Sequence, residues 1–241
     1  MPERREAGSP GPVAGARASR VPERTVTRLS IYLRCLEELQ TDGLTAVSSK
    51  QLAQRFGLNS AQVRKDLAYF GQFGVRGLGY YVGELKHNLE RILGLKHDWQ
   101  VALVGVGNLG SALLAYPGFQ HRGFRLSVAF EKDPAKIGGR QGRVPIHRIE
   151  RIGPVLKRRA IRIAILAIPA AGAQAVADQL VAAGVNAILN FAPTQLTVPR
   201  GVKVQNVDLS VLLKTLAFHT KRTDRPHAVP APKPAVSSVP G

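Results

Sequence analysis

The spacing of apolar residues near the start of the chain predicts a long amphipathic helix. Leucines recur every three or four residues up to Gly43, and glycine is common just past the end of a helix. The repeating residues are Leu29, Leu33, Leu36 and Leu39. They predict one face that packs inside a small helical domain. Cys35 falls in the same segment, where a small buried hydrophobic side chain is favoured over a reactive thiol.

Two short helices are predicted next, each opened by a capping residue and closed by a glycine. The first begins at Ser48 or Ser49 and ends at Gly57, and the second begins at Asn59 or Ser60 and ends at Gly71. Two short helices joined by a three-residue turn are typical of a helix-turn-helix, whose second helix can enter the major groove of DNA. Residues 74–85 then predict two short extended runs, around Gly77 and Gly79, that form a hairpin wing. The module is predicted to be a winged helix.

The pattern changes near residues 94–100, from helical periods to alternating strands and helices. Strands are predicted within 99–107, 124–133, 161–169, 186–193 and 202–208, and helices within 111–116, 171–185 and 209–219. Alternation of this kind implies a parallel sheet with helices on both faces. The chain is therefore predicted to be an α/β protein with a Rossmann-like second domain.

These patterns divide the chain into two domains, a terminal helix and two tails. The predicted boundaries are 21–97 for the winged-helix DNA-binding domain, 98–205 for the dinucleotide-binding domain and 206–221 for the terminal helix. Residues 1–20 and 222–241 are rich in Pro, Ala, Ser and Gly and have almost no large apolar side chains. Such segments cannot bury enough surface to offset the entropy of ordering, so both tails are predicted to be disordered.

Composition and charge narrow the class of protein. The sequence has neither a secretory signal nor an apolar run long enough to cross a membrane, so we expect a cytoplasmic protein. One cysteine excludes an internal disulfide or a multi-cysteine zinc site, and we expect no metal. A net charge of +18 is typical of a nucleic-acid partner. The basic segment 148–162 is either a solvated face or a second nucleic-acid surface.

Three glycines in the order G-x-G-x-x-G follow a predicted strand and open a predicted helix, which is the context that a dinucleotide-binding turn requires. Gly105 permits the tight turn, Gly107 lets the backbone approach a pyrophosphate, and Gly110 permits close packing of helix on strand. Glu131, at the end of the next strand, is predicted to accept hydrogen bonds from a ribose, and Asp133 competes for that role. This favours NAD(H), although Lys132 could also meet the 2′-phosphate of NADP(H).

No catalytic residue is predicted. An oxidoreductase needs a group that moves a proton or polarises a carbonyl beside the nicotinamide. His121 and His147 lie in basic surroundings without an acidic partner at a recognisable spacing, and His219 lies at the end of the terminal helix. A dinucleotide-binding sheet joined to a DNA-binding module therefore indicates a sensor.

Several polar and basic residues of the first domain are candidates for DNA contact. Val63, Leu67 and Phe70 form the buried stripe of the second short helix, which leaves its other face exposed. Arginine and lysine read guanine or hold phosphates, and glutamine pairs with adenine. The candidates are Gln62, Arg64 and Lys65 on that helix, Arg76 at the tip of the wing, and Ser48 and Ser49 at the start of the preceding helix.

Taken together, these segments closely resemble the Rex family of bacterial redox-sensing transcriptional repressors. The resemblance runs from about Val21 to Thr220, and its most specific part is QVRKDL with the glycine-rich run that follows. It implies a homodimer whose winged helices bind palindromic operators and whose Rossmann domains sense NADH against NAD+. The resemblance also implies that NADH releases the DNA and that NAD+ permits repression.

The resemblance also assigns roles to single residues. It places Arg64 and Lys65 on the recognition helix, Arg76 on the wing, Gly105, Val106, Gly107, Asn108, Leu109 and Gly110 at the pyrophosphate, Glu131 with Lys132 at the adenosine ribose, and Asn190, Phe191 and Ala192 near the nicotinamide. It assigns Tyr116 and Asp208 to the switch between the two states of the dimer, and it implies that the terminal helix is exchanged between subunits.

Two other functions stay open on the sequence alone. One is an NAD-dependent oxidoreductase with an accessory DNA-binding domain, against which the missing acid and base weigh. The other is an architectural DNA-binding protein with a vestigial nucleotide site, which the net charge suggests.

Overall fold

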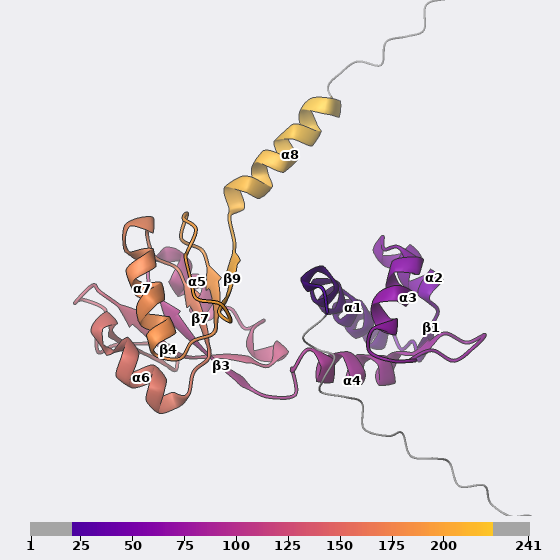
Figure 1. Ribbon diagram of the computed structural model, residues 1–241, viewed down its shortest axis with the longest axis horizontal. Coiled ribbons are helices and arrows are strands. Elements are labelled where there is room, and N and C mark those ends of the chain that lie inside the picture. The colour runs from indigo at the N-terminus through magenta and orange to yellow at the C-terminus, as the bar shows by residue number, and fades with distance from the viewer. Residues whose placement is uncertain (1–20, 224–241) are drawn as a thin grey trace, which may run out of the picture. The chain divides into compact units, whose positions relative to one another are not determined.

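The computed structural model describes residues 21–223 (Figure 1). The tails predicted to be disordered, 1–20 and 222–241, lie outside this range except for residues 222 and 223, which end a helix. The chain divides between Asp98 and Trp99 into two compact units. Within the described range, no helix is long and apolar enough to cross a membrane.

The first unit is mainly helical. Its elements are α1 (Glu23–Thr41), β1 (Ala46–Val47), α2 (Ser49–Phe56), α3 (Ser60–Ala68), β2 (Tyr80–Tyr81) and α4 (Val82–Ile92). The predicted leucine stripe of α1 is buried, and Cys35 lies in the same core. Val63 and Leu67 of α3 pack into it as well. One apolar cluster therefore holds the helices of this unit together.

Local capping sets where α2 and α3 begin. The Ser48 hydroxyl accepts a hydrogen bond from the backbone N–H of Gln51, whose side chain in turn accepts from the backbone N–H of Ser48. Gly57 ends α2 at φ +64°, in the left-handed region, and the Asn59 side chain caps α3. The turn between the two helices is therefore the predicted three-residue turn.

The hairpin wing is present but shorter than predicted. Val75 pairs with Gly79, and β2 runs antiparallel to β1. The extended run predicted through residue 85 is wrong, because α4 begins at Val82. Val82, Leu85 and Leu89 have helical spacing and are buried, since α4 packs against α1. Burial of this face outweighs the strand preference of the preceding tyrosines.

The second unit is a seven-stranded sheet with helices. Its strands are β3 (Trp99–Val104), β4 (Phe124–Glu131), β5 (Arg140–Gln141), β6 (Val144–Arg148), β7 (Ile163–Leu166), β8 (Ala187–Asn190) and β9 (Lys203–Asn206). Its α-helices are α5 (Asn108–Ala115), α6 (Ile152–Arg159), α7 (Ala170–Ala182) and α8 (Leu209–Thr223), and 3₁₀ turns lie at Gln120–Arg122 and Ile149–Arg151. The strand order is β5-β6-β4-β3-β7-β8-β9, and all neighbours except β5 and β6 run parallel.

Both faces of this sheet are covered. Ala102 and Val104 of β3 belong to one apolar cluster with α6 and α7, whereas Val101 and Leu103 belong to another that includes residues of α5. The alternation follows from the two-residue repeat of a strand. The predicted α/β class, with a winged helix followed by a Rossmann-like domain, is confirmed.

Three elements were not predicted. The hairpin β5–β6 and helix α6 occupy residues 140–159, and α6 falls in the basic segment 148–162. Ile152, Val155 and Leu156 are buried under the sheet, so residues 152–159 form an amphipathic helix with a basic outer face.

Candidate functional site

The predicted DNA-contact residues lie on α2, α3 and the wing of the first unit. Arg64, Lys65 and Arg76 are exposed. A side-chain nitrogen of Arg64 donates to the Ser49 hydroxyl at 2.9 Å, which links the middle of α3 to the start of α2. The structure holds Gln62 differently, because its amide donates to the Asp66 carboxylate at 2.9 Å. A base contact by Gln62 would therefore compete with an internal hydrogen bond.

Asp66, which the sequence analysis did not single out, is the centre of a buried polar network. Its side chain is 0% exposed. Arg28 donates to its two oxygens at 2.6 and 2.7 Å, the Tyr32 hydroxyl at 2.8 Å and the Thr25 hydroxyl at 3.3 Å. Because these partners lie on α1, the network fixes α3 against α1.

The network determines the charge of Asp66. Burial alone would raise its pKa, but hydrogen bonds from Arg28, Tyr32 and Gln62 lower the pKa to about 2. The pKa of Tyr32 is raised by burial and by its bond to the carboxylate. The sequence carried a signal for this role. Asp66 follows Val63 by three residues, on the buried side of α3, where an acid needs partners.

The glycine turn lies between β3 and α5. Gly105 has φ +94°, and a Cβ there would overlap the carbonyl oxygen of Ala167. A Cβ on Gly110 would overlap the carbonyl oxygen of Gly105, so the helix passes too close to the turn for any side chain. At Gly107, which caps α5, a Cβ would meet no protein atom within 4 Å. That position is open to a ligand.

Glu131, at the end of β4, holds the turn through backbone groups. Its carboxylate accepts N–H bonds from Val106 at 2.6 Å, Lys132 at 2.7 Å and Asp133 at 3.1 Å. Lys136 donates to the carbonyl of Val106 at 2.9 Å. Burial would raise the pKa of Glu131, but the three N–H bonds and the charge of Lys136 lower it. Glu131 is therefore a stable carboxylate beside the glycines.

A cleft of about 340 Å³ brings several predicted residues together. Its lining includes Gly105, Gly107, Glu131, Lys132 and Asp133. It also includes residues that the sequence analysis missed, among them Lys136 beside the turn and Ala167, Ile168 and Pro169 after β7. In the sheet, β3 lies between β4 on one side and β7 on the other, so the strand order reverses direction at β3. Open α/β sheets bind ligands at such a switch point. The sequence signal for Ala167, Ile168 and Pro169 was their position at the end of the strand predicted within 161–169.

Of the residues predicted near the nicotinamide, Asn190 ends β8, and Phe191 and Ala192 follow it. Asn190 is buried, and its amide donates to Asn206 at 2.9 Å and to the Thr194 carbonyl at 2.8 Å. Its side-chain oxygen accepts from the N–H of Ala192 at 3.0 Å. Asn190 thus holds the turn, and any ligand contact there falls more naturally to Phe191 and Ala192. Ala192 and Asp208 line a cavity of about 570 Å³.

The two predicted switch residues lie next to different helices of this unit, Tyr116 after α5 and Asp208 before α8. Tyr116 follows α5, is exposed, and meets Phe119 edge-to-face with ring centroids 5.2 Å apart. Asp208 precedes α8 and accepts the N–H groups of Ser210 and Val211 at 2.9 and 3.2 Å. Hydrogen bonds from Ser210 and Val211 lower its pKa. The structure does not bring Tyr116 and Asp208 into contact within one chain.

A winged helix joined to a dinucleotide-type cleft defines a nucleotide-responsive DNA-binding protein. Residues 20–68 match the family described as "Putative DNA-binding protein N-terminus", and residues 96–194 match the family described as "CoA binding domain". A relative from Carboxydothermus hydrogenoformans, the redox-sensing transcriptional repressor Rex, is 51% identical over 84% of this chain and 98% of its own. The chain belongs to the Rex family, which confirms the resemblance.

Solved structures of RSP, which is described as a Rex-family repressor, agree with this family. The structure of RSP in complex with beta-NAD+ and operator DNA has a TM-score of 0.81 and 39% identity, over 85% of this chain and 94% of that one. The structure of RSP with beta-NADH has a TM-score of 0.78 and 37% identity, over 85% and 96%.

Proposed function

We propose that this chain is a transcriptional repressor that senses NADH against NAD+ and leaves its operator when NADH binds. One observation carries the proposal: a glycine turn of the dinucleotide-binding type and a helix-turn-helix occur in one chain. This chain is similar to RSP, which was solved with NAD+ and operator DNA and with NADH. A ligand shifts an equilibrium only by binding one state more tightly. NADH must therefore bind the DNA-releasing state more tightly than it binds the DNA-bound state.

The cleft at the glycine turn fits a dinucleotide. The first turn of α5 has backbone N–H groups without partners inside the helix, and Gly107 leaves room for a pyrophosphate to approach them. A carboxylate has about four acceptor sites, and three N–H groups use the Glu131 carboxylate, so it can still accept a ribose hydroxyl. We assign Gly105, Val106, Gly107, Asn108, Leu109, Gly110, Glu131 and Lys132 to this end of the ligand, and Phe191 and Ala192, held by Asn190, to the nicotinamide end.

The first unit supplies the DNA contacts in this proposal. Arg64 and Lys65 project from α3, Arg76 lies on the wing, and Ser48 and Ser49 start α2. Basic side chains on an exposed helix can read guanine or hold phosphates. The Asp66 network supports DNA binding by α3 because it holds α3 in a fixed orientation against α1.

We infer that the working form is a homodimer in which α8 packs on a partner. Six large apolar side chains of α8 are between 53% and 65% exposed, which is unusual for one soluble helix. They are Leu209, Val211, Leu212, Leu213, Leu216 and Phe218. A two-fold dimer presents two recognition helices and so fits a palindromic operator. Such a dimer could also bring Tyr116 of one subunit to Asp208 of another.

We infer that the nucleotide is sensed rather than turned over. The relatives of this chain are repressors. Within the described part of the chain, no histidine lines the cleft at the glycine turn or the cavity beside Asp208. His147 lies on β6, and burial and the nearby Arg159 lower its pKa.

The test uses operator duplexes selected from a random-sequence pool by the full-length protein. NADH should weaken operator binding, and NAD+ should not. Gly107→Val should remove the response without unfolding the protein, because the added side chain enters open space. Arg64→Ala, the matched control, should weaken operator binding by roughly 1 to 3 kcal/mol and leave NADH binding intact. Equal effects of NADH and NAD+, or a normal response in Gly107→Val, would contradict the proposal.

A further inference from the structure

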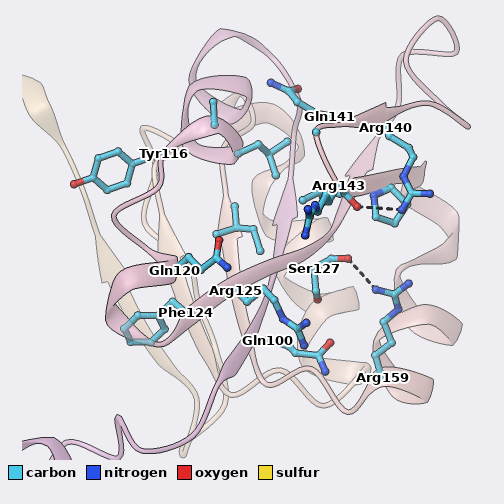
Figure 2. A pocket seen from close by; sticks show the side chains of 16 residues that line it. Gln100, Tyr116, Gln120, Phe124, Arg125, Ser127, Arg140, Gln141, Arg143 and Arg159 are labelled. Atoms are coloured by element: carbon cyan, nitrogen blue, oxygen red, sulfur yellow. Dashed lines mark hydrogen bonds between the residues drawn. The ribbon is translucent and has the colours of Figure 1, made fainter.

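A second cavity in the Rossmann-like unit shares no lining residue with the dinucleotide cleft. It has a volume of about 850 Å³ and lies between the end of α5, the first half of β4 and the hairpin β5–β6 (Figure 2). Gln100 and Phe124 place it near the amino ends of β3 and β4, whereas the glycine turn follows the carboxyl end of β3. Its volume is in the range of sites that hold small molecules.

Four arginines surround this cavity, as Figure 2 shows: Arg125, Arg140, Arg143 and Arg159. No acidic side chain is among the described residues that line it. None of the four forms an ion pair within residues 21–223. The cavity therefore concentrates positive charge that the described chain does not neutralise.

Two of the arginines are anchored and two are available. Arg159 donates to the Ser127 carbonyl at 2.8 Å, and Arg140 donates to the Arg143 carbonyl at 3.1 Å (Figure 2). The hairpin is fixed in turn by Gln141, which donates to the Ser111 carbonyl of α5 at 3.0 Å. Anchored guanidinium groups retain further N–H donors, which are arranged to match a phosphate or a carboxylate.

One polar side chain beside the cavity, Ser127, has no hydrogen-bond partner among the described residues. Its side-chain oxygen is buried and makes no hydrogen bond within the described residues, although Ser127 lines the cavity. A buried hydroxyl without a partner is uncommon in folded proteins, because leaving it unpaired costs free energy.

We propose that this cavity binds a small organic polyphosphate. Several guanidinium groups around one concave site suit a chain of two or more phosphates, which they can hold through paired hydrogen bonds. Leu114, Phe124, Leu126 and Val144 line the same cavity and offer an apolar wall to an organic part. A DNA backbone is a less suitable occupant, because duplex phosphates lie on a convex surface and the arginines line a hollow. Tyr116, the predicted switch residue, also lines this cavity, but the proposal is argued from the four arginines and does not require the redox function.

The experiment is calorimetric titration of adenosine triphosphate and of inorganic tripolyphosphate into the full-length protein at physiological ionic strength. The test variant is Arg125→Gln/Arg143→Gln, because neither side chain forms a hydrogen bond within residues 21–223 and folding should be retained. Binding should weaken roughly tenfold or more, since hydrogen bonds to charged groups are lost. Arg151→Gln/Arg158→Gln removes the same charge from exposed residues outside the cavity and should leave binding nearly unchanged.

Each outcome decides the proposal. Tighter binding of the nucleotide than of tripolyphosphate, lost selectively in the cavity variant, supports an organic polyphosphate; equal binding, lost in the same way, supports recognition of the phosphate chain. Equal weakening in both double variants would show only an effect of net charge and would overturn the proposal. Loss of binding in Gly107→Val would place the probe in the dinucleotide cleft and overturn it as well. Absence of binding of either probe to the unchanged protein would also overturn the proposal. A cavity variant that loses binding of duplex DNA instead of binding of the probes would overturn it too.

Discussion

The two units hold their candidate sites by different means. In the first, side chains do it: Asp66 on α3 is bound by Arg28 and Tyr32 on α1. In the second unit, backbone groups hold the site. Gly110 lies so close to the Gly105 carbonyl that a side chain would not fit, and backbone N–H groups hold the Glu131 carboxylate. The recognition helix should therefore be sensitive to loss of charge, and the glycine turn to added volume.

The largest expected effect is at the glycine turn. Gly110→Ala should destabilise the second unit by roughly 3 kcal/mol or more, because the new methyl group overlaps the Gly105 carbonyl and backbone atoms must move. Urea unfolding followed by fluorescence of Trp99, the single tryptophan, would measure this. Gly153→Ala in α6 meets nothing within 4 Å and should be neutral or slightly stabilising. Similar losses in both variants would refute a special packing role for Gly110.

The second effect tests the charge network. Asp66→Asn should destabilise the first unit by roughly 2 to 3 kcal/mol, because it keeps the shape but leaves Arg28 without its carboxylate. Faster hydrogen exchange in peptides from α1 and α3 would report it. Asp42→Asn, which breaks the exposed ion pair with Arg55, should cost less than about 1 kcal/mol. If the two variants were equally stable, the buried network would not be what fixes α3.

The third effect is acid sensitivity confined to the first unit. Asp66 has a pKa of about 2 in the folded protein and about 3.9 in an unfolded chain, so the unfolded state binds the proton first. Its stabilisation, on the order of 2 kcal/mol, is complete above about pH 4 and lost as the pH falls toward 2. Hydrogen exchange of α3 peptides across this range should show the loss. Asp66→Asn should remove that pH dependence, and its persistence in the variant would point to another acid.

Much of the fold followed from sequence periodicity. The leucine stripe, the capped pair α2–α3 and the alternating second half all have strong local signals. Residues 82–85 were assigned to a strand, because only packing against α1 decides that they begin a helix. The hairpin β5–β6 and α6 were missed, since short strands and a helix with three basic residues in its last turn carry weak apolar patterns.

The candidate sites show the same limit. Gly105, Gly107 and Gly110 could be located because their motif is contiguous and follows a strand, and Glu131 because it ends the next strand. Asp66 was overlooked because its partners lie 34 and 38 residues away on α1, a distance that no local pattern reveals. The arginine-lined cavity draws on β4, the hairpin and α6, so only the folded sheet assembles it.

The central claim is that the two units are linked, so that NADH in the cleft and operator DNA on α3 oppose one another. The most direct test is to measure the NADH dissociation constant with and without operator, and the operator dissociation constant with and without NADH, in one buffer. Thermodynamic linkage requires both to weaken by the same factor. We predict equal factors greater than one. An NADH affinity that operator DNA leaves unchanged would contradict the account.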